Sequence, residues 1–268
     1  MASSRSVKGA PVPSWLEQLL VGQLFHFILV FARIGTAFTF MTGFGESFVL
    51  ARARLVIALG TALVMTPVIA PSLPPMPAGP LDLAVLLIGE ILVGIVFGTA
   101  TRLVMSALEL AGTLVAFQSG LASATVFNPM ISTQGALPSV YLAVMAMVLM
   151  FQTDLHHLTI RALAATYGVL TPGQLPPVGD FTEFVVRLIG EAFLIGVQIS
   201  SPFLILITVM YVGVGLVSRL MPQIQIFFIT LPLQIGLGLL LLVLVSSSMM
   251  LVFLEYYATV ISSMFAPR

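Results

Sequence analysis

The chain has 268 residues, of which 59% are hydrophobic and only 7% are charged, and its ten basic and ten acidic side chains leave no formal net charge. A soluble domain has about 25% charged residues, so twenty charged side chains are too few to form a soluble surface. Without an excess of basic residues, we expect no nucleic acid partner. The sequence contains no cysteine, which excludes disulfides, thiolate metal sites and cysteine nucleophiles.

Residues 1–13 are small, polar and proline-containing, and we expect a disordered N-terminal extension there. Residues 14–268 are predicted to form a single helical domain. The predicted helices are apolar segments near residues 19–43, 55–71, 83–101, 137–153, 185–217 and 233–253. Each of four uncharged stretches is longer than the roughly 20 residues that a helix needs to cross hydrocarbon: 55–81, 110–153, 192–218 and 220–254. The sequence therefore predicts an all-α, polytopic membrane-type protein.

Prolines and glycines interrupt these apolar segments. Proline inside a helix removes a hydrogen bond and costs about 3 kcal/mol unless its surroundings compensate, and in lipid the freed carbonyl finds no water. Gly94 and Gly98 form a GxxxG pair, a pattern typical of close helix contacts. The prolines within the segments or at their ends are Pro67, Pro202, Pro222 and Pro232. The combination favours broken or kinked helices in a helical assembly over straight helices surrounded by lipid.

A few charged residues lie within the apolar segments, where facing lipid would be costly. They are Arg33, Glu90, Glu109, Arg187 and Glu191. We expect them to face protein, water or one another, and Arg187 and Glu191 have the i, i+4 spacing that allows a pair on one helix face. Internal ion pairs that fix packing are the main interpretation, and a proton or ion relay is the alternative.

Little in the sequence supports catalysis or metal binding. The stretch QTDLHHL (152–158) places Asp154 and His157 three residues apart, so that both could lie on one helix face. Adjacent histidines on a regular helix point about 100° apart, which argues against a shared ion for His156 and His157, and no third ligand is evident. No GxSxG, P-loop or HExxH pattern is present. We predict no catalytic residue, no cofactor and no metal site, and therefore no enzyme.

The stretch FQSGLASATVFNP (117–129) concentrates an amide, a glycine and hydroxyls after an apolar segment. A plain transmembrane helix does not usually carry this composition. One interpretation is a tightly packed helix end. The other is an irregular loop that lines a cavity, since irregular backbone at membrane depth needs protein or water around it.

The stretch SRLMPQIQIFFITLPLQIGLG (218–238) holds two prolines ten residues apart, Pro222 and Pro232. They are predicted to delimit a piece of about ten residues, at most ~15 Å long if helical, which is about half a bilayer. Such a piece suits the bend between two helices of a hairpin. Gln223, Gln225 and Gln234 could satisfy backbone groups freed at these breaks or bond to a neighbouring subunit.

These two stretches resemble segments of the FliR family of flagellar export-gate proteins. FQSGLASATVFNP is similar to a family segment with a Gln-x-Gly-Leu-x-x-Ala core, and SRLMPQIQIFFITLPLQIGLGL is similar to the C-terminal signature of that family. The Gly89-Glu90 pair ahead of Gly94 and Gly98, the DLHHLTI segment, and the order and length of the elements are also similar. The resemblance covers nearly the whole chain from about residue 15.

The resemblance implies a subunit of the flagellar type III secretion system in the bacterial inner membrane, at the flagellar basal body. FliR-like proteins assemble with FliP and FliQ into a helical export gate with which FlhB and FlhA associate, and unfolded flagellar proteins pass through it. The fold is expected to join a FliP-like part to a FliQ-like C-terminal hairpin near residues 185–268, in contact with lipid and partner subunits. Much of such a gate lies outside the bilayer plane.

The resemblance also implies two sets of site residues. A pore-loop region near residues 103–138 would carry a plug formed by Phe117, Gln118, Gly120, Leu121, Phe127, Asn128 and Pro129. A partner-contacting hairpin bend would include Arg219, Pro222, Gln223, Gln225, Phe227, Pro232 and Gln234. The alternatives are the homologous subunit of a virulence secretion system, a secondary transporter with broken helices and buried charges, and a purely structural membrane scaffold.

Overall fold

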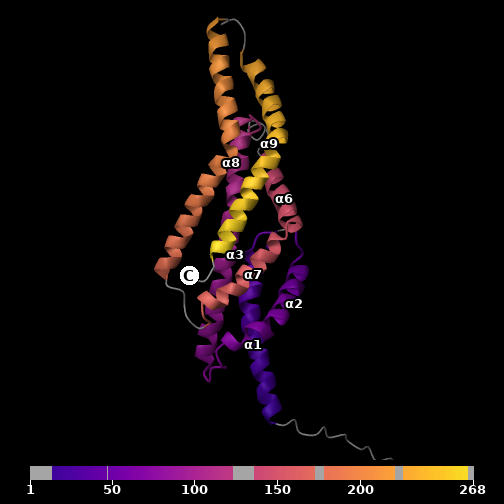
Figure 1. Ribbon diagram of the computed structural model, residues 1–268, viewed down its shortest axis with the longest axis vertical. Helices are drawn as coiled ribbons and strands as arrows, with labels where there is room; N and C mark the ends of the chain where they lie inside the picture. The colour runs from indigo at the N-terminus through magenta and orange to yellow at the C-terminus, as the bar shows by residue number, and fades with distance from the viewer. Residues whose placement is uncertain (1–13, 47, 123–135, 173–177, 221–225, 265–268) are drawn as a thin grey trace, which may run out of the picture.

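A computed structural model describes residues 14–46, 48–122, 136–172, 178–220 and 226–264. The expected N-terminal extension lies outside these residues. The described part is helical and contains no strand, which confirms the predicted all-α class. The helices are α1 Ser14–Phe40, α2 Ala51–Ile69 with the short 3₁₀ helix η1 Ala70–Ser72, α3 Pro80–Gln118, α6 Leu137–Gln152, α7 Leu155–Val169, α8 Val178–Leu220 and α9 Ile226–Met264 (Figure 1).

Three of these helices are longer than the sequence predicted. The segment near 83–101 continues through Arg102 into α3, which has 39 residues, and α8 and α9 have 43 and 39 residues. A 39-residue helix is about 58 Å long, roughly twice the hydrocarbon thickness. In the described part of the chain, five helices are long and apolar enough to cross a membrane, and the bent pair α6–α7 is a sixth candidate.

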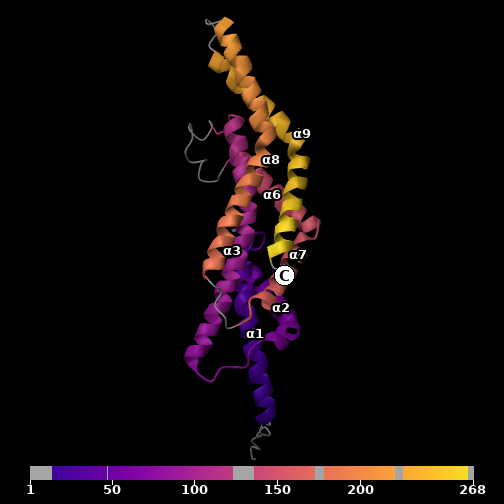
Figure 2. The same ribbon diagram turned by 60° about the vertical axis from the view of Figure 1, so that its left-hand side comes forward.

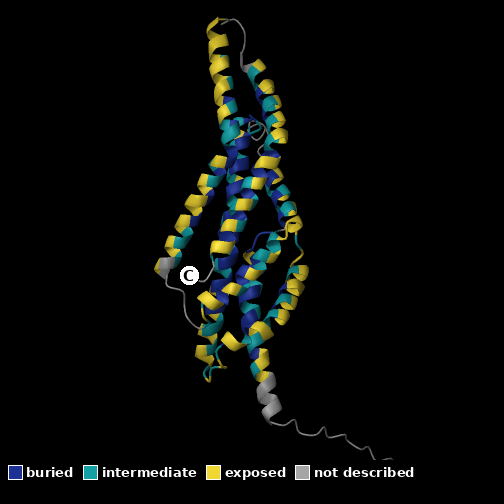
Figure 3. Cartoon of the chain, viewed as in Figure 1, coloured by how far each residue is buried: buried dark blue, intermediate teal, exposed yellow. Residues whose placement is uncertain are grey.

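Helix α3 is the central element of the fold. It packs against α1, α6 and α8, and it lies along the middle of the elongated molecule in both ribbon views (Figures 1 and 2). Its start carries Pro80 in the first turn and Asp82 nearby, two features that favour a helix N-terminus. Buried residues follow α3 from Gly89 to Ala116, whereas the outer faces of α2 and α8 are largely exposed (Figure 3).

The GxxxG pair of α3 lies directly against α1. A Cβ atom on Gly98 would come within 2.6 Å of Phe40 Cβ and 2.8 Å of the Ala37 carbonyl oxygen, and one on Gly94 would overlap Thr36. Any larger side chain at these positions would force the two helices apart. The glycines therefore set the closest approach between α1 and α3.

The buried charges Arg33 and Glu90 form an ion pair between α1 and α3. Arg33 donates from Nε to Glu90 Oε2 at 2.7 Å and from Nη2 to Glu90 Oε1 at 2.9 Å. It also donates to the Thr166 hydroxyl and to the Leu170 carbonyl oxygen, and its guanidinium lies 3.8 Å from the centre of the Tyr167 ring. One side chain thus ties α1, α3 and the end of α7 together with every charged group paired.

The remaining charges within the apolar segments lie at the surface. Arg187 and Glu191 approach to 3.9 Å on an exposed face of α8, a pair that contributes little to stability. Glu109 is exposed and lines a groove of about 590 Å³ together with Glu46 and Arg102.

Helices α6 and α7 meet at a 78° bend, which the sequence did not predict. The apolar segment near 137–153 becomes α6, but α7 was not among the predicted helices. Asp154 separates the two with a left-handed backbone (φ 58°), a conformation that aspartate tolerates better than most residues.

Helices α8 and α9 form a hairpin, and Pro232 does not delimit it. The two helices run antiparallel, and their adjoining ends extend beyond α3 at the top of Figures 1 and 2. Pro67, Pro202 and Pro232 all lie inside helices. The prediction of a ten-residue piece ended by Pro232 is therefore wrong, because α9 already begins at Ile226 and continues through this proline. Pro222 lies outside the described residues.

Candidate functional site

The two stretches singled out in the sequence meet where α3 ends against the α8–α9 hairpin. The Gln234 side chain in α9 donates from Nε2 to the backbone carbonyl oxygen of Gln118 at 2.5 Å. Its Oε1 accepts a hydrogen bond from the Tyr211 hydroxyl in α8 at 3.3 Å. Gln234 is only 5% exposed. We call this set of contacts, made by Gln118, Tyr211 and Gln234, the loop-base joint.

The loop-base joint satisfies a group that the end of α3 leaves free. The last carbonyls of a helix have no partner within it, and Gln118 is the last residue of α3. The neighbouring amides turn back onto the helix, with Ser119 donating to Val115 and Ala122 donating to Ala116. The Gln118 carbonyl instead takes its donor from α9.

Two glycines allow the close approach at this joint. Gly120 has a positive φ of 72°, and a Cβ atom there would lie 3.4 Å from both Gln234 Cδ and Leu231 Cδ1. Gly238, one turn further along α9, faces the fully buried Ser119, and a Cβ atom on it would overlap the serine side chain. A side chain at position 238 would separate α3 from α9, whereas at position 120 the positive φ is what favours glycine.

The predicted plug residues divide into two groups around the joint. Gly120 is buried, and Gln118 and Leu121 are half-buried. Phe117 is 66% exposed although it is a large aromatic side chain. The other predicted plug residues lie outside the described part of the chain: Phe127, Asn128 and Pro129.

The predicted hairpin residues are only partly gathered at the joint. Arg219 lies in the last turn of α8 and is exposed, and Pro232 is exposed on α9. Gln234 bonds to the end of α3 rather than to a backbone group freed by a proline. Phe227 belongs to α9, but its side chain is not described, and Pro222, Gln223 and Gln225 lie outside the described residues.

Tyr211 was not among the predicted site residues. A single tyrosine in an apolar helix is unremarkable alone, but a buried glutamine in the adjacent helix needs partners for both its donor and its acceptor. The position of Gln234 in an apolar helix is the only signal that points to such a partner.

The outer face of α8 exposes many large apolar side chains. These include Val186, Ile189, Phe193, Leu194, Ile205, Val209, Val212, Leu216, Val217 and Leu220. An exposed surface of this kind is unfavourable in water and is typical of contact with lipid or with another protein. The α8–α9 hairpin thus holds the end of α3 through Gln234. Its outer face on α8 needs an apolar neighbour.

Comparison with known proteins gives a consistent result along most of the chain. Residues 24–260 match the family described as "Bacterial export proteins, family 1". The flagellar biosynthetic protein FliR of Caulobacter vibrioides is 34% identical over 239 residues, which cover 89% of this chain and 95% of that protein. The FliR protein of Bacillus subtilis is 27% identical over 241 residues, which cover 89% of this chain and 92% of that protein.

A relative from a virulence system is also similar over a shorter region. The Yop proteins translocation protein T of Yersinia pestis is 27% identical over 152 residues, which cover 56% of this chain and 58% of that protein. The match to the export family spans far more than half of the sequence. The chain therefore belongs to the family of bacterial export proteins that includes the flagellar biosynthetic protein FliR.

Proposed function

We propose that this chain is a subunit of the flagellar type III protein export gate in the bacterial inner membrane, where it assembles with FliP- and FliQ-type proteins around a channel for unfolded flagellar proteins. The long family match and the FliR-type relatives support a role in a type III export apparatus. The apolar helices support a location in a membrane. FlhB- and FlhA-type proteins are the further partners that this role requires.

The observation that carries the proposal is the loop-base joint. A gate must close against small ions and yet open for a polypeptide. In our proposal the residues from Phe117 to Pro129 form a plug whose apolar side chains exclude water from the channel. Gln234 holds the base of that plug on α9, while Gly120 provides the backbone freedom at the point where the loop leaves the helix.

The exposed apolar face of α8 supports the assembly part of the proposal. A membrane protein that worked alone would need to cover this face with lipid along all 43 residues of α8, although that length is about 65 Å, roughly twice the hydrocarbon core. Neighbouring subunits cover the part that extends beyond the bilayer. The α8–α9 hairpin is then the FliQ-like part of the chain, and its bend contacts partner subunits.

Co-expression with FliP- and FliQ-type proteins, followed by purification in detergent, tests the assembly. The proposal expects a stable complex that contains one copy of this chain. A well-behaved monomer that ignores both proteins and binds a small solute would instead favour a secondary transporter.

Substitution of Gly120 or Phe127 tests the plug. The proposal expects a change in small-solute leak across the inner membrane or in the amount of secreted flagellar protein. If residues 117–129 can all be substituted with no change in leak or secretion, the chain is a structural scaffold and not a gate.

The similarity to the Yersinia protein makes a virulence export system the second candidate. Complementation separates the two candidates, because a flagellar subunit should restore motility to a strain that lacks its own FliR. Restoration of virulence-protein secretion alone would favour the second candidate.

A further inference from the structure

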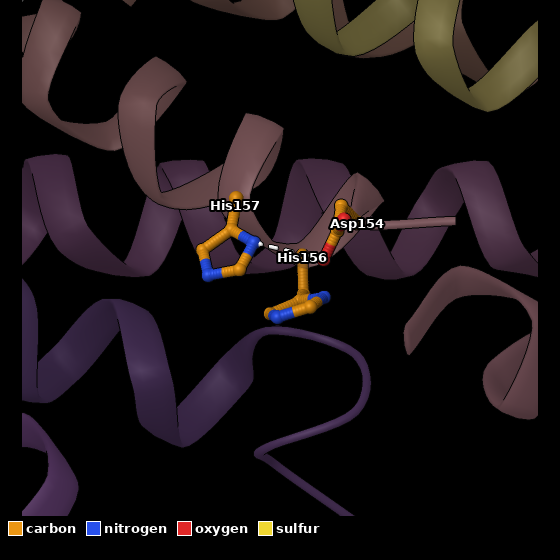
Figure 4. A group of neighbouring side chains, drawn as sticks. All are labelled: Asp154, His156 and His157. Carbon is orange, nitrogen blue, oxygen red and sulfur yellow. Dashed lines mark hydrogen bonds and ion pairs between the residues drawn. The ribbon is translucent and has the colours of Figure 1, made fainter. Parts of the chain in front are cut away.

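Three metal-binding side chains converge at the bend between α6 and α7. Asp154, His156 and His157 each offer one ligand atom, and these atoms all lie within 4.8 Å of one another. Figure 4 shows the aspartate and the two imidazoles gathered at the start of α7. The cluster is separate from the loop-base joint, and the export function proposed above does not use it.

The backbone at the start of α7 brings Asp154 to the two adjacent histidines, whose rings lie close together although their positions on the helix are about 100° apart. Asp154 precedes α7 with a left-handed backbone, so that its carboxylate turns toward the first residues of the helix. Its Oδ1 lies 3.2 Å from His157 Nδ1. The rings of His156 and His157 have centroids only 4.0 Å apart. The three side chains therefore lie close together. His156, which the helix periodicity excluded as a shared ligand, is the third one.

The ligand set is suited to a transition metal. Two imidazoles and a carboxylate are ligands of Zn²⁺, which binds nitrogen at about 2.0–2.1 Å and oxygen at about 2.0–2.2 Å in a tetrahedral site. Two ligands on such bonds are about 3.4 Å apart. The 3.2 Å between Asp154 and His157 is close to this separation, and the ligand atoms of the whole cluster lie within 4.8 Å of one another, so metal binding requires the side chains to move closer together.

A second observation points to a missing partner at the same place. Nδ1 of His156 is buried and has no hydrogen-bond partner among the described residues. The ring is held by Phe151, whose centroid lies 5.0 Å away. A buried polar atom without a partner is costly, and binding of a cation at this imidazole would remove that cost, through Nδ1 directly or by reorienting the ring.

We propose that Asp154, His156 and His157 bind one divalent transition-metal ion, for which Zn²⁺ is the best match, with the fourth position open to water. Asp154 and His157 are 76% and 61% exposed, so the ion has direct access from outside the helices. Because Asp154 is the N-cap residue of α7 and both histidines lie in its first turn, a bound ion would fix the start of α7.

Zn²⁺ titration of the full chain in detergent tests this site, with a purification tag that contains no histidine. The sequence has only three histidines and no cysteine, so His26 in α1 is the natural control. We expect one Zn²⁺ per chain for the parent and for H26N by isothermal titration calorimetry. In D154N, H156Q and H157Q the affinity should fall by at least the roughly tenfold that loss of even an outer-shell partner of a metal ligand costs.

A second measurement uses only the parent chain, so its result does not depend on whether the variants fold. In the parent chain, Zn²⁺ should protect His156 and His157, but not His26, from modification by diethylpyrocarbonate, as mapped by mass spectrometry. The proposal is overturned if the parent binds no Zn²⁺ at millimolar concentration, if H156Q and H157Q keep the parental affinity, or if protection is equal at all three histidines.

Discussion

The side-chain amide of Gln234 donates a hydrogen bond to the backbone carbonyl of Gln118 at 2.5 Å, across 116 positions of sequence. This contact joins the start of the 117–129 stretch to the C-terminal hairpin. It uses a donor from α9 to satisfy the end of α3, and Tyr211 from α8 satisfies the acceptor of the same amide. One buried side chain therefore links three helices at the base of the proposed plug.

Removal of this amide should weaken the fold. In Q234L the Gln118 carbonyl and the Tyr211 hydroxyl both lose a partner in a part-buried setting, so the free energy of unfolding should fall by about 1 kcal/mol. Unfolding in mixed detergent micelles, followed by circular dichroism, measures the change. Q152L removes an exposed glutamine at the end of α6 and should stay within about 0.5 kcal/mol of the parent. Equal losses in both variants would argue against the joint.

Gly120 should not tolerate a side chain. G120A places a Cβ on a residue with φ 72°, which costs about 1–2 kcal/mol through the backbone, while the methyl group itself would only touch Gln234 and Leu231. G213A is the matched control, because Gly213 lies inside α8 with open space around it and alanine favours a helix by up to about 1 kcal/mol. In the same unfolding assay we expect G120A to lower the free energy of unfolding and G213A to raise it. A G120A protein as stable as G213A would contradict the positive φ of Gly120.

The Arg33–Glu90 pair should show strong coupling. R33M and E90L each leave one buried charge without its partner, so each should lower the free energy of unfolding by about 3–5 kcal/mol. The double variant R33M/E90L should lose less than the sum of the two, because it leaves no isolated charge. R187M breaks the exposed pair with Glu191 and should change stability by less than about 1 kcal/mol. Additive losses at Arg33 and Glu90 would show that the two residues do not interact.

Enlarging Gly98 should separate α1 from α3. In G98L the new side chain would meet Phe40 and Ala37, and such overpacking costs about 1–3 kcal/mol. Gly60 on an exposed face of α2 has nothing within 4 Å of a Cβ position. G60L should therefore leave the melting temperature unchanged or slightly raised, whereas G98L should lower it. If G60L lowered the melting temperature and G98L did not, the close contact of Gly98 with α1 would be contradicted.

The features that follow from local composition could be predicted from the sequence. The apolar stretches indicated membrane-type helices, the spacing of Gly94 and Gly98 indicated a close helix contact, and charges within apolar segments indicated pairing. Each of these inferences depends only on the cost of leaving polar or crowded groups in an apolar setting. The structure has the apolar helices and the glycine contact, and it pairs Arg33 with Glu90 in the interior, whereas Glu109, Arg187 and Glu191 lie at the surface.

The features that depend on three-dimensional contacts could not be predicted in this way. Helix α7 was missed because Arg161 and the two histidines lower the apolar character of 155–169, and its stability comes partly from packing on α9. Pro232 was expected to end a helix, but near the start of α9 it removes a single hydrogen bond. The partner of Gln234 lies in another helix far along the chain, and no local pattern identifies it.

Control of the proposed plug by the loop-base joint requires that secretion depend on Gln234, and the Q234L variant measures this dependence. The parent, Q234L and Q152L are produced in a strain that lacks its own FliR, and secreted flagellar protein and small-solute leak are measured after gate assembly has been verified. The account predicts parental values for Q152L, and reduced secretion or raised leak for an assembled Q234L gate. Parental secretion and leak in an assembled Q234L gate would contradict it.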